Sequence, residues 1–250
     1  MIRLFSAGIL LIALCQQIQA QTINTFWLGS FNTFQLDKKF SIHLDAQFRT
    51  GDKYSQMSTL LVRPGINYKP NDQWMFTLGY AYTANRRSLP ALSGPNELEP
   101  VVGYIPEHRF WEQALYTHKL IGKNTISHRI RLEQRVLMQP SIDGDKLVTD
   151  GNTYSNRFRY WFRTMIPFNQ QFPFKQGWFG SMQNEVFLNF GDKSAVNGKT
   201  FDQNRLFFGA GYRLNPAVDF EVAYINQHVI GRGDAFVNNH VAQAGVYLRL

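Results

Sequence analysis

The feature that most constrains the fold of this chain is a strict alternation of apolar and polar residues. In residues 40–49 (FSIHLDAQFR), the even-numbered positions are Phe, Ile, Leu, Ala and Phe, and the odd-numbered positions are Ser, His, Asp, Gln and Arg. Because successive side chains of a β-strand point to opposite faces, one face of this segment is apolar and the other is polar. The same pattern recurs almost to Leu250, so the sequence predicts an all-β protein.

Eleven segments show this pattern, and the connections between them alternate in length. The segments are residues 25–36, 40–49, 58–69, 74–85, 107–121, 126–138, 154–166, 178–190, 205–213, 218–228 and 240–250. Short connections (37–39, 70–72, 122–124, 215–217) alternate with longer ones (50–57, 86–106, 139–152, 191–204, 229–239), and 167–177 is intermediate. Bacterial membrane barrels have short periplasmic turns, long outer loops and an even number of strands. We therefore expect a closed antiparallel transmembrane β-barrel of twelve strands, with ten as the alternative.

Hydropathy indicates whether such a chain would cross a membrane with helices or with strands. After Leu14 no stretch approaches the roughly 18 apolar residues that a spanning helix needs, and the mean hydropathy is −0.28. Aromatic residues nevertheless make up 15% of the chain and gather in the alternating segments. A soluble β-sandwich or lipocalin-like barrel also alternates, but its apolar face is the core. The aromatic faces and the alternating connections favour lipid contact by a sheet that closes on itself.

The first twenty residues have the pattern of a secretory signal. A short basic start ending at Arg3 precedes an apolar run over residues 4–14, and Ala20 is a small residue suited to cleavage before Gln21. We expect residues 1–20 to be removed and residues 21–250 to form one domain in the outer membrane of a Gram-negative bacterium. Cys15 is the one cysteine, and Leu14 before it argues against lipidation.

The predicted polar faces carry many arginines and fewer carboxylates. The candidates to line the lumen are Arg49, Arg63, Arg129, Arg131, Glu133, Arg135, Arg157, Arg159, Arg163, Glu185, Arg205, Arg213 and Glu221, with Asp45 and Asp219 on the same faces. Two interpretations stay open. Excess guanidinium groups could line a narrow pore that favours small anionic solutes, or arginines and carboxylates of neighbouring strands could fill the lumen with ion pairs.

Partners and catalytic groups are less clearly indicated. Gln243, Gly245, Leu248 and Leu250 resemble the terminal signal by which the barrel-assembly machinery recognises outer-membrane barrels. Arg86 and Arg87 could pair with lipopolysaccharide phosphates, and residues 232–234 spell an Arg-Gly-Asp adhesion tripeptide in an outer loop.

A hydrolase is the least favoured interpretation. Its nearest candidate cluster is Glu107, His108 and Glu112, whose adjacent members point to opposite faces of a strand. The sequence has no metal-ligand spacing, no phosphate-cradling glycine loop and no nucleic-acid motif. We expect no enzyme activity, no cofactor, no metal and no nucleic-acid partner.

Several short segments together resemble one known family. They are Trp27, Phe48-Arg49, Gly79-Tyr80, Glu107-His108-Arg109 with Trp111, Arg131-Leu132-Glu133-Gln134-Arg135, and Asn184-Glu185. The chain is similar in these segments to the outer-membrane family called domain of unknown function 2490, and the Glu-His-Arg and Arg-Leu-Glu-Gln-Arg segments are the most specific. The resemblance implies a Gram-negative outer-membrane barrel and carries no established activity.

Overall fold

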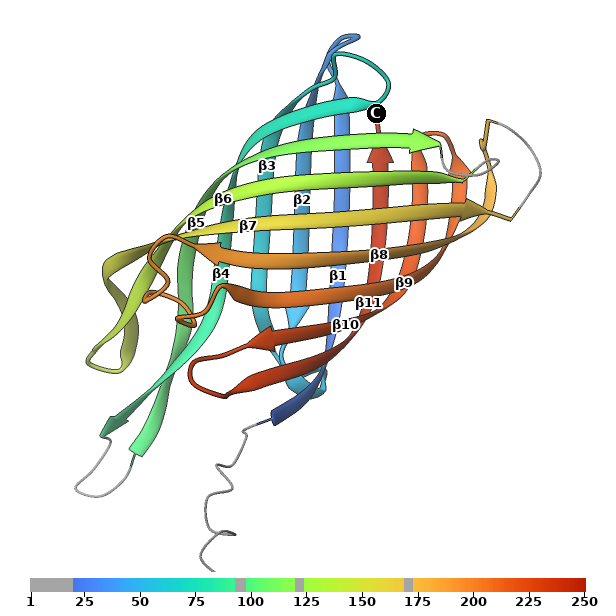
Figure 1. Cartoon of the computed structure of the whole chain (residues 1–250). Helices are drawn as coiled ribbons and strands as arrows, with labels where there is room; N and C mark the ends of the chain where they lie inside the picture. The colour runs from blue at the N-terminus through green and yellow to red at the C-terminus, as the bar shows by residue number, and fades with distance from the viewer. Residues whose placement is uncertain (1–19, 93–97, 120–123, 169–172) are drawn as a thin grey trace, which may run out of the picture.

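The chain forms one closed β-barrel (Figure 1), seen in a computed structural model that describes residues 20–92, 98–119, 124–168 and 173–250. Within these residues no helix is long and apolar enough to cross a membrane. The elements are β1 (Ala20–Gln35), β2 (Phe40–Thr50), the 3-10 turn η1 (Asp52–Tyr54), β3 (Met57–Tyr68), β4 (Trp74–Leu92), β5 (Leu98–Lys119), β6 (Thr125–Asp143), β7 (Lys146–Pro167), β8 (Gly177–Phe190), β9 (Phe201–Asn215), β10 (Val218–Ile230) and β11 (Phe236–Arg249).

The described wall has eleven strands, where the parity rule predicts twelve or ten. Each strand is antiparallel to its neighbour in sequence, and β1 closes the barrel by pairing in parallel with β11, from Ala20 opposite Phe236 to Thr33 opposite Arg249. A parallel pair lets an odd number of strands close without leaving an edge. The eleven segments of the alternating pattern are therefore the whole wall, and the start of β1 lies at the opposite end of the barrel from Leu250 (Figure 1).

The barrel has two distinct ends. The short-turn end carries the turns 36–39, 69–73 and 216–217, the described residues 168 and 173–176 of a longer connection, and Leu250. The long-loop end carries the loops 51–56, 191–200 and 231–235 and the ends of β6 and β7 that meet at 144–145. In the turn at 36–39, Asp37 Oδ1 accepts the backbone N–H groups of Lys39 (2.7 Å) and Phe40 (2.8 Å). These two hydrogen bonds lower the pKa of Asp37.

Two stretches expected to be irregular are strand instead. The prediction of long loops at 86–106 and 139–152 is wrong, because β4 and β5 continue to Leu92 and Leu98, and β6 and β7 meet at a two-residue turn, Gly144 and Asp145. These added lengths of strand, called strand arms, pair β4 with β5 and β6 with β7. The pairing satisfies the backbone N–H and C=O groups of the arms. Gly144 has φ +60°, a conformation that glycine adopts without steric cost.

The two faces of the wall differ as the alternation predicts. On the outside, Leu78 is 70% exposed and Val222 is 63% exposed, while on the inside Arg131 and Glu133 are 1% and 2% exposed. The stripe expected to face outward on β4, which ends in aromatic residues, does so, and Thr77 and Thr83 point inward. A closed sheet that is apolar outside and charged inside is the fold of a transmembrane β-barrel.

The outer face yields a direct test of lipid contact. Leu78 lies midway along the outward stripe that runs from Trp74 to Tyr82. We expect Leu78→Arg to lower the free energy of unfolding by about 2–4 kcal/mol in lipid vesicles, because an arginine on the lipid face must leave water. Urea unfolding followed by tryptophan fluorescence measures this change. Lys146→Arg at the exposed turn is the control, and an unchanged stability of Leu78→Arg would mean that this face contacts water.

Candidate functional site: the arginine-rich lumen

All thirteen residues predicted to line the lumen lie on the inner face of the wall. They occupy odd-numbered positions on β2, β3, β6, β7, β8, β9 and β10, in phase with the buried side chains of each strand. The phase of β5, which the sequence left open, places Trp111 inside at 2% exposed and Phe110 outside at 57% exposed. Glu107 and Arg109 of the family segment therefore join the lumen, and His108 does not.

The candidate catalytic cluster of β5 is divided between the two faces. Glu107 points inward, whereas His108 and Glu112 point outward in phase with Phe110. Outside, His108 Nδ1 lies 2.5 Å from the Tyr80 hydroxyl, and Glu112 accepts a hydrogen bond of 2.9 Å from Gln134. These residues do not assemble into one site.

A second arrangement on β2 escaped the sequence reasoning. Ser41, His43 and Asp45 share the inner face at alternate positions, and His43 Nε2 lies 3.2 Å from Asp45 Oδ1. Ser41 Oγ instead accepts a hydrogen bond from Asn67 (3.0 Å), and Asp45 also forms an ion pair with Arg63. Among the described hydrogen bonds none joins Ser41 to His43, so the three residues do not form a nucleophilic triad.

Glu133 is the centre of the inner ion-pair network. Arg157 donates to Glu133 Oε2 from Nε (3.0 Å) and Nη2 (2.6 Å), and Arg159 donates to Glu133 Oε1 from Nη1 (2.5 Å). Arg159 also donates to Glu185 from Nε (3.0 Å) and Nη2 (2.7 Å), and Arg129 donates to the same carboxylate (2.7 Å). Five side chains of β6, β7 and β8 thus form one continuous chain of alternating charge.

The long-loop half of the lumen contains a second ion-pair cluster. Glu107 accepts hydrogen bonds from Arg109 (2.8 Å and 3.1 Å) and from Arg135 (2.6 Å). Arg157 extends the network toward the same end through Asp202, 3.0 Å away. These groups are largely buried and bind one another, so their side chains occupy part of the lumen toward this end.

Two further carboxylates anchor arginines toward the short-turn end. Glu221 accepts hydrogen bonds from Arg163 (2.7 Å), Ser181 (2.5 Å) and Tyr247 (2.7 Å). Asp219, the next inward position, is bound by Arg213 through Nε (2.8 Å) and Nη2 (2.9 Å) and by Arg249 (2.8 Å). The inward placement of Arg249 was not anticipated, although its odd-numbered position on the last strand is a usable signal.

A tryptophan lying flat on the inner wall positions one arginine of the network. A Cβ at Gly79 would lie 2.3 Å from the Trp111 indole, and one at Gly65 would lie 3.1 Å from it. The absence of side chains at these two positions makes room for the ring. The Arg131 guanidinium stands 4.4 Å from the centroid of Trp111 and donates twice to Gln113 (3.0 Å and 2.6 Å).

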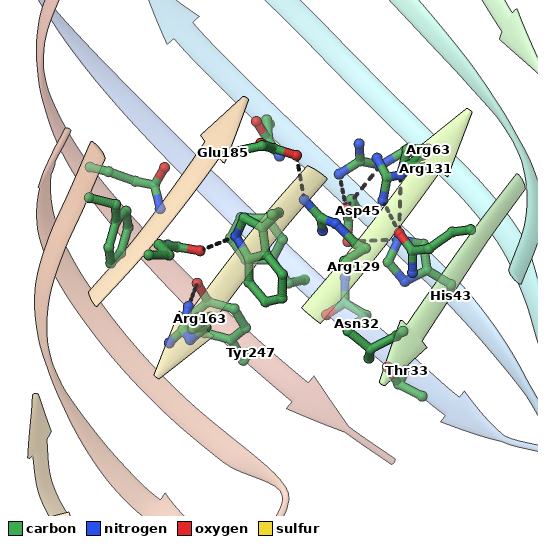
Figure 2. A pocket seen from close by; sticks show the side chains of 18 of the residues that line it. Asn32, Thr33, His43, Asp45, Arg63, Arg129, Arg131, Arg163, Glu185 and Tyr247 are labelled. Atoms are coloured by element: carbon green, nitrogen blue, oxygen red, sulfur yellow. Dashed lines mark hydrogen bonds and ion pairs between the residues drawn. The ribbon is translucent and has the colours of Figure 1, made fainter. Parts of the chain in front are cut away.

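A cavity of about 410 Å³ lies in the lumen, and its lining extends from residues near the short turns to Arg49 and Arg205, which lie toward the long-loop end of β2 and β9. Thr33, Met75, Leu115 and Met165, which lie near the short turns, contribute to its wall, whereas Glu107, Arg109, Arg135 and Arg157 do not. Figure 2 shows Arg63, Arg129 and Arg131 gathered near Asp45, with Arg163 beside Tyr247 farther along the wall. Eight arginines line the cavity, against three carboxylates, those of Asp45, Glu185 and Asp219.

Guanidinium groups therefore outnumber carboxylates on the wall of the cavity. Guanidinium groups present fixed N–H donors to carboxylates and phosphates, and they keep their charge at any physiological pH. Within the described ranges, no group of three or more His, Cys, Asp or Glu residues is placed to hold a metal ion.

Breaking the network at its centre has a predictable effect on stability. We expect Glu133→Gln to lower the free energy of unfolding by about 3–5 kcal/mol, because it leaves Arg157 and Arg159 buried with less compensating charge. Urea unfolding in lipid vesicles measures the loss. Asp72→Asn, which removes the exposed ion pair of Asp72 with Lys69 at a short turn, should change stability little. Equal effects of the two substitutions would contradict a stabilising role for Glu133.

Three comparisons relate the chain to known proteins. A search of curated proteins finds no match. Among solved structures, the chain is similar to one titled as the NanC porin, with 12% sequence identity, a TM-score of 0.45, and coverage of 79% of this chain and 78% of that one. Residues 24–238 match DUF2490, a family described as "Protein of unknown function". The match covers most of the chain, including every segment on which the resemblance rested, and the chain belongs to the DUF2490 family.

Proposed function

We propose that this protein is an outer-membrane β-barrel whose lumen admits small anionic solutes. The observation that carries the proposal is the imbalance of charge in the cavity, which eight arginines and three carboxylates line. Rings of arginine or lysine in a pore favour anions. The apolar outer face supports the location, because closed barrels of this kind belong to the outer membrane in bacteria.

We infer the orientation of the barrel from the strand arms of β4 with β5 and of β6 with β7 and the loop 191–200, which extend one end, and from the turns 36–39, 69–73 and 216–217 at the other. Short turns of bacterial barrels face the periplasm and long loops face outward. In that orientation Leu250 lies at the periplasmic end of β11, and Gln243, Gly245 and Leu248 of the proposed assembly signal lie in the half of the strand that leads to it. The predicted signal segment fits export, although it lies almost entirely outside the described residues. The tripeptide at 232–234 lies in the long-loop end and stays a candidate for surface binding.

The ion-pair clusters of Glu107 and Glu133 obstruct part of the proposed path. The Glu107 cluster lies beyond the cavity toward the long-loop end, and the Glu133 cluster lies beside the cavity, where Arg131 and Glu133 are almost fully buried. A solute has to displace or pass these side chains, so we expect a small conductance rather than that of an open porin. The same burial favours a second candidate, a structural barrel whose filled lumen passes nothing.

Recording from single proteins in planar bilayers separates the two candidates. Under a gradient of potassium chloride we expect small, discrete openings. We expect the reversal potential to shift toward the equilibrium potential of chloride, because the arginines that line the cavity outnumber its carboxylates. The variant Arg49→Glu/Arg205→Glu should lose or reverse this anion preference.

The matched control for the recording makes the same charge change outside the lumen. Lys53→Glu/Lys146→Glu alters two exposed turns at the long-loop end and should keep the anion preference. Silent bilayers, with the protein shown to be folded and inserted, would reject the pore and leave the filled structural barrel.

A further inference from the structure

Two arginines of the cavity differ from the other arginines of the lumen. For Arg49 and Arg205, no carboxylate oxygen of the described residues lies within 4.0 Å. Their side-chain partners are neutral amides, Gln47 Oε1 at 2.7 Å from Arg49 and Gln203 Oε1 at 3.3 Å from Arg205. Arg205 lies opposite Glu185 in the register of β8 and β9, but that carboxylate is already engaged by two other arginines.

Both guanidinium groups lie against the same indole ring. Arg49 is 4.0 Å and Arg205 is 5.1 Å from the centroid of Trp27, which is 6% exposed. Trp27 is opposite Arg49 in the pairing of β1 with β2, whereas Arg205 comes from β9, three strands away across the closure of the barrel. The barrel therefore holds two like charges beside one aromatic ring, and each is held there by cation–π attraction.

Part of the hydrogen-bonding capacity of these groups is unmet within the described protein. The Nε atoms of Arg49 and Arg205 are buried and have no acceptor in the described protein, and the same holds for Arg129 Nε and Arg131 Nη1. All four side chains line the cavity. Arg49 and Arg205 are only partly buried. An anion in the cavity would therefore supply the counter-charge that these two guanidinium groups lack.

The rest of the lining defines what kind of anion fits. Leu61, Phe207 and Ile225 line the cavity as buried apolar side chains, and Phe207 and Ile225 belong to one buried cluster with Trp27. Cavities of several hundred Å³ with an apolar wall and a few polar groups are typical of sites for small organic molecules. A carboxylate matches the planar fork of a guanidinium, and an apolar body matches the remaining wall.

We propose that the Trp27–Arg49–Arg205 cavity is a binding site for a small organic carboxylate with an apolar body. The carboxylate lies between the two arginines, and the body contacts Leu61, Phe207 and Ile225. This inference deepens the proposed function, on which it rests for the class of solute, but it concerns binding and does not require conduction.

Calorimetric titration of the full chain in lipid nanodiscs tests the site, with benzoate as the probe. We expect saturable binding of one benzoate per barrel. Benzamide, the neutral counterpart, and acetate, which lacks the ring, should each bind at least about tenfold more weakly, because each loses one of the two sets of contacts. Absence of saturable benzoate binding, or equal binding of benzamide, would overturn the proposal.

Variants distinguish a ligand site from a structural cluster. Arg49→Gln and Arg205→Gln should each weaken benzoate binding about tenfold or more, while the unfolding midpoint without ligand stays the same or rises, because one of two neighbouring like charges is removed. Lys146→Gln at the exposed turn is the control and should leave binding unchanged. If both arginine variants lower the midpoint and retain benzoate affinity, the arginines are structural and the proposal is wrong.

Together with the bilayer recordings, these measurements test the binding site and the pore independently. Benzoate binding by a protein that is silent in planar bilayers would reject the pore and support the site. Anion-selective openings without saturable benzoate binding would support the pore and reject the site.

Discussion

The structure depends on one constraint, that every backbone N–H and C=O group of a wall in contact with lipid has to find its partner within the wall. Hydrocarbon offers no hydrogen-bond partner, so the sheet has to close. Here β1 closes it by running parallel to β11 over fourteen paired positions, from Ala20 to Thr33. The sheet therefore closes without an exposed edge although its strand number is odd. Because β1 and β11 are parallel, the two strands begin at the same end of the barrel.

Closure turns the polar half of every strand into an interior. Side chains that would be solvated on an open sheet are brought together at low exposure, and arginines in such a space need counter-charges. Glu133, Glu107, Glu221 and Asp219 each hold two arginines or an arginine with hydroxyl donors. The arginines outnumber these carboxylates, and eight arginines line the cavity. The charge imbalance that supports the proposed anion chemistry therefore comes from arginines that have no carboxylate partner, whereas the other arginines of the network are paired.

Much of this arrangement could be predicted from local pattern alone. Period-two alternation identified the inward face at each of the thirteen lumen residues, because the direction of a strand side chain depends only on its parity. It was less informative for β5, where aromatic residues occupy both parities, and it missed the strand arms that follow Asn85 and Met138. Those arms contain prolines and polar residues, and they are strand because each arm pairs with the other, a contact that no single segment reveals.

The sequence by itself determined the all-β class, the outward aromatic stripes, the inward charges and the family, since all of these are carried by local order along the chain. Only the tertiary structure decided which charges meet. Arg129 reaches Glu185 and Arg163 reaches Glu221 across 56 and 58 positions of sequence, and Arg205 joins Arg49 at Trp27 only because β1 and β11 close the wall. The physical reason is that a strand determines the direction of its side chains locally, whereas the register and closure of the sheet determine the neighbours of each side chain.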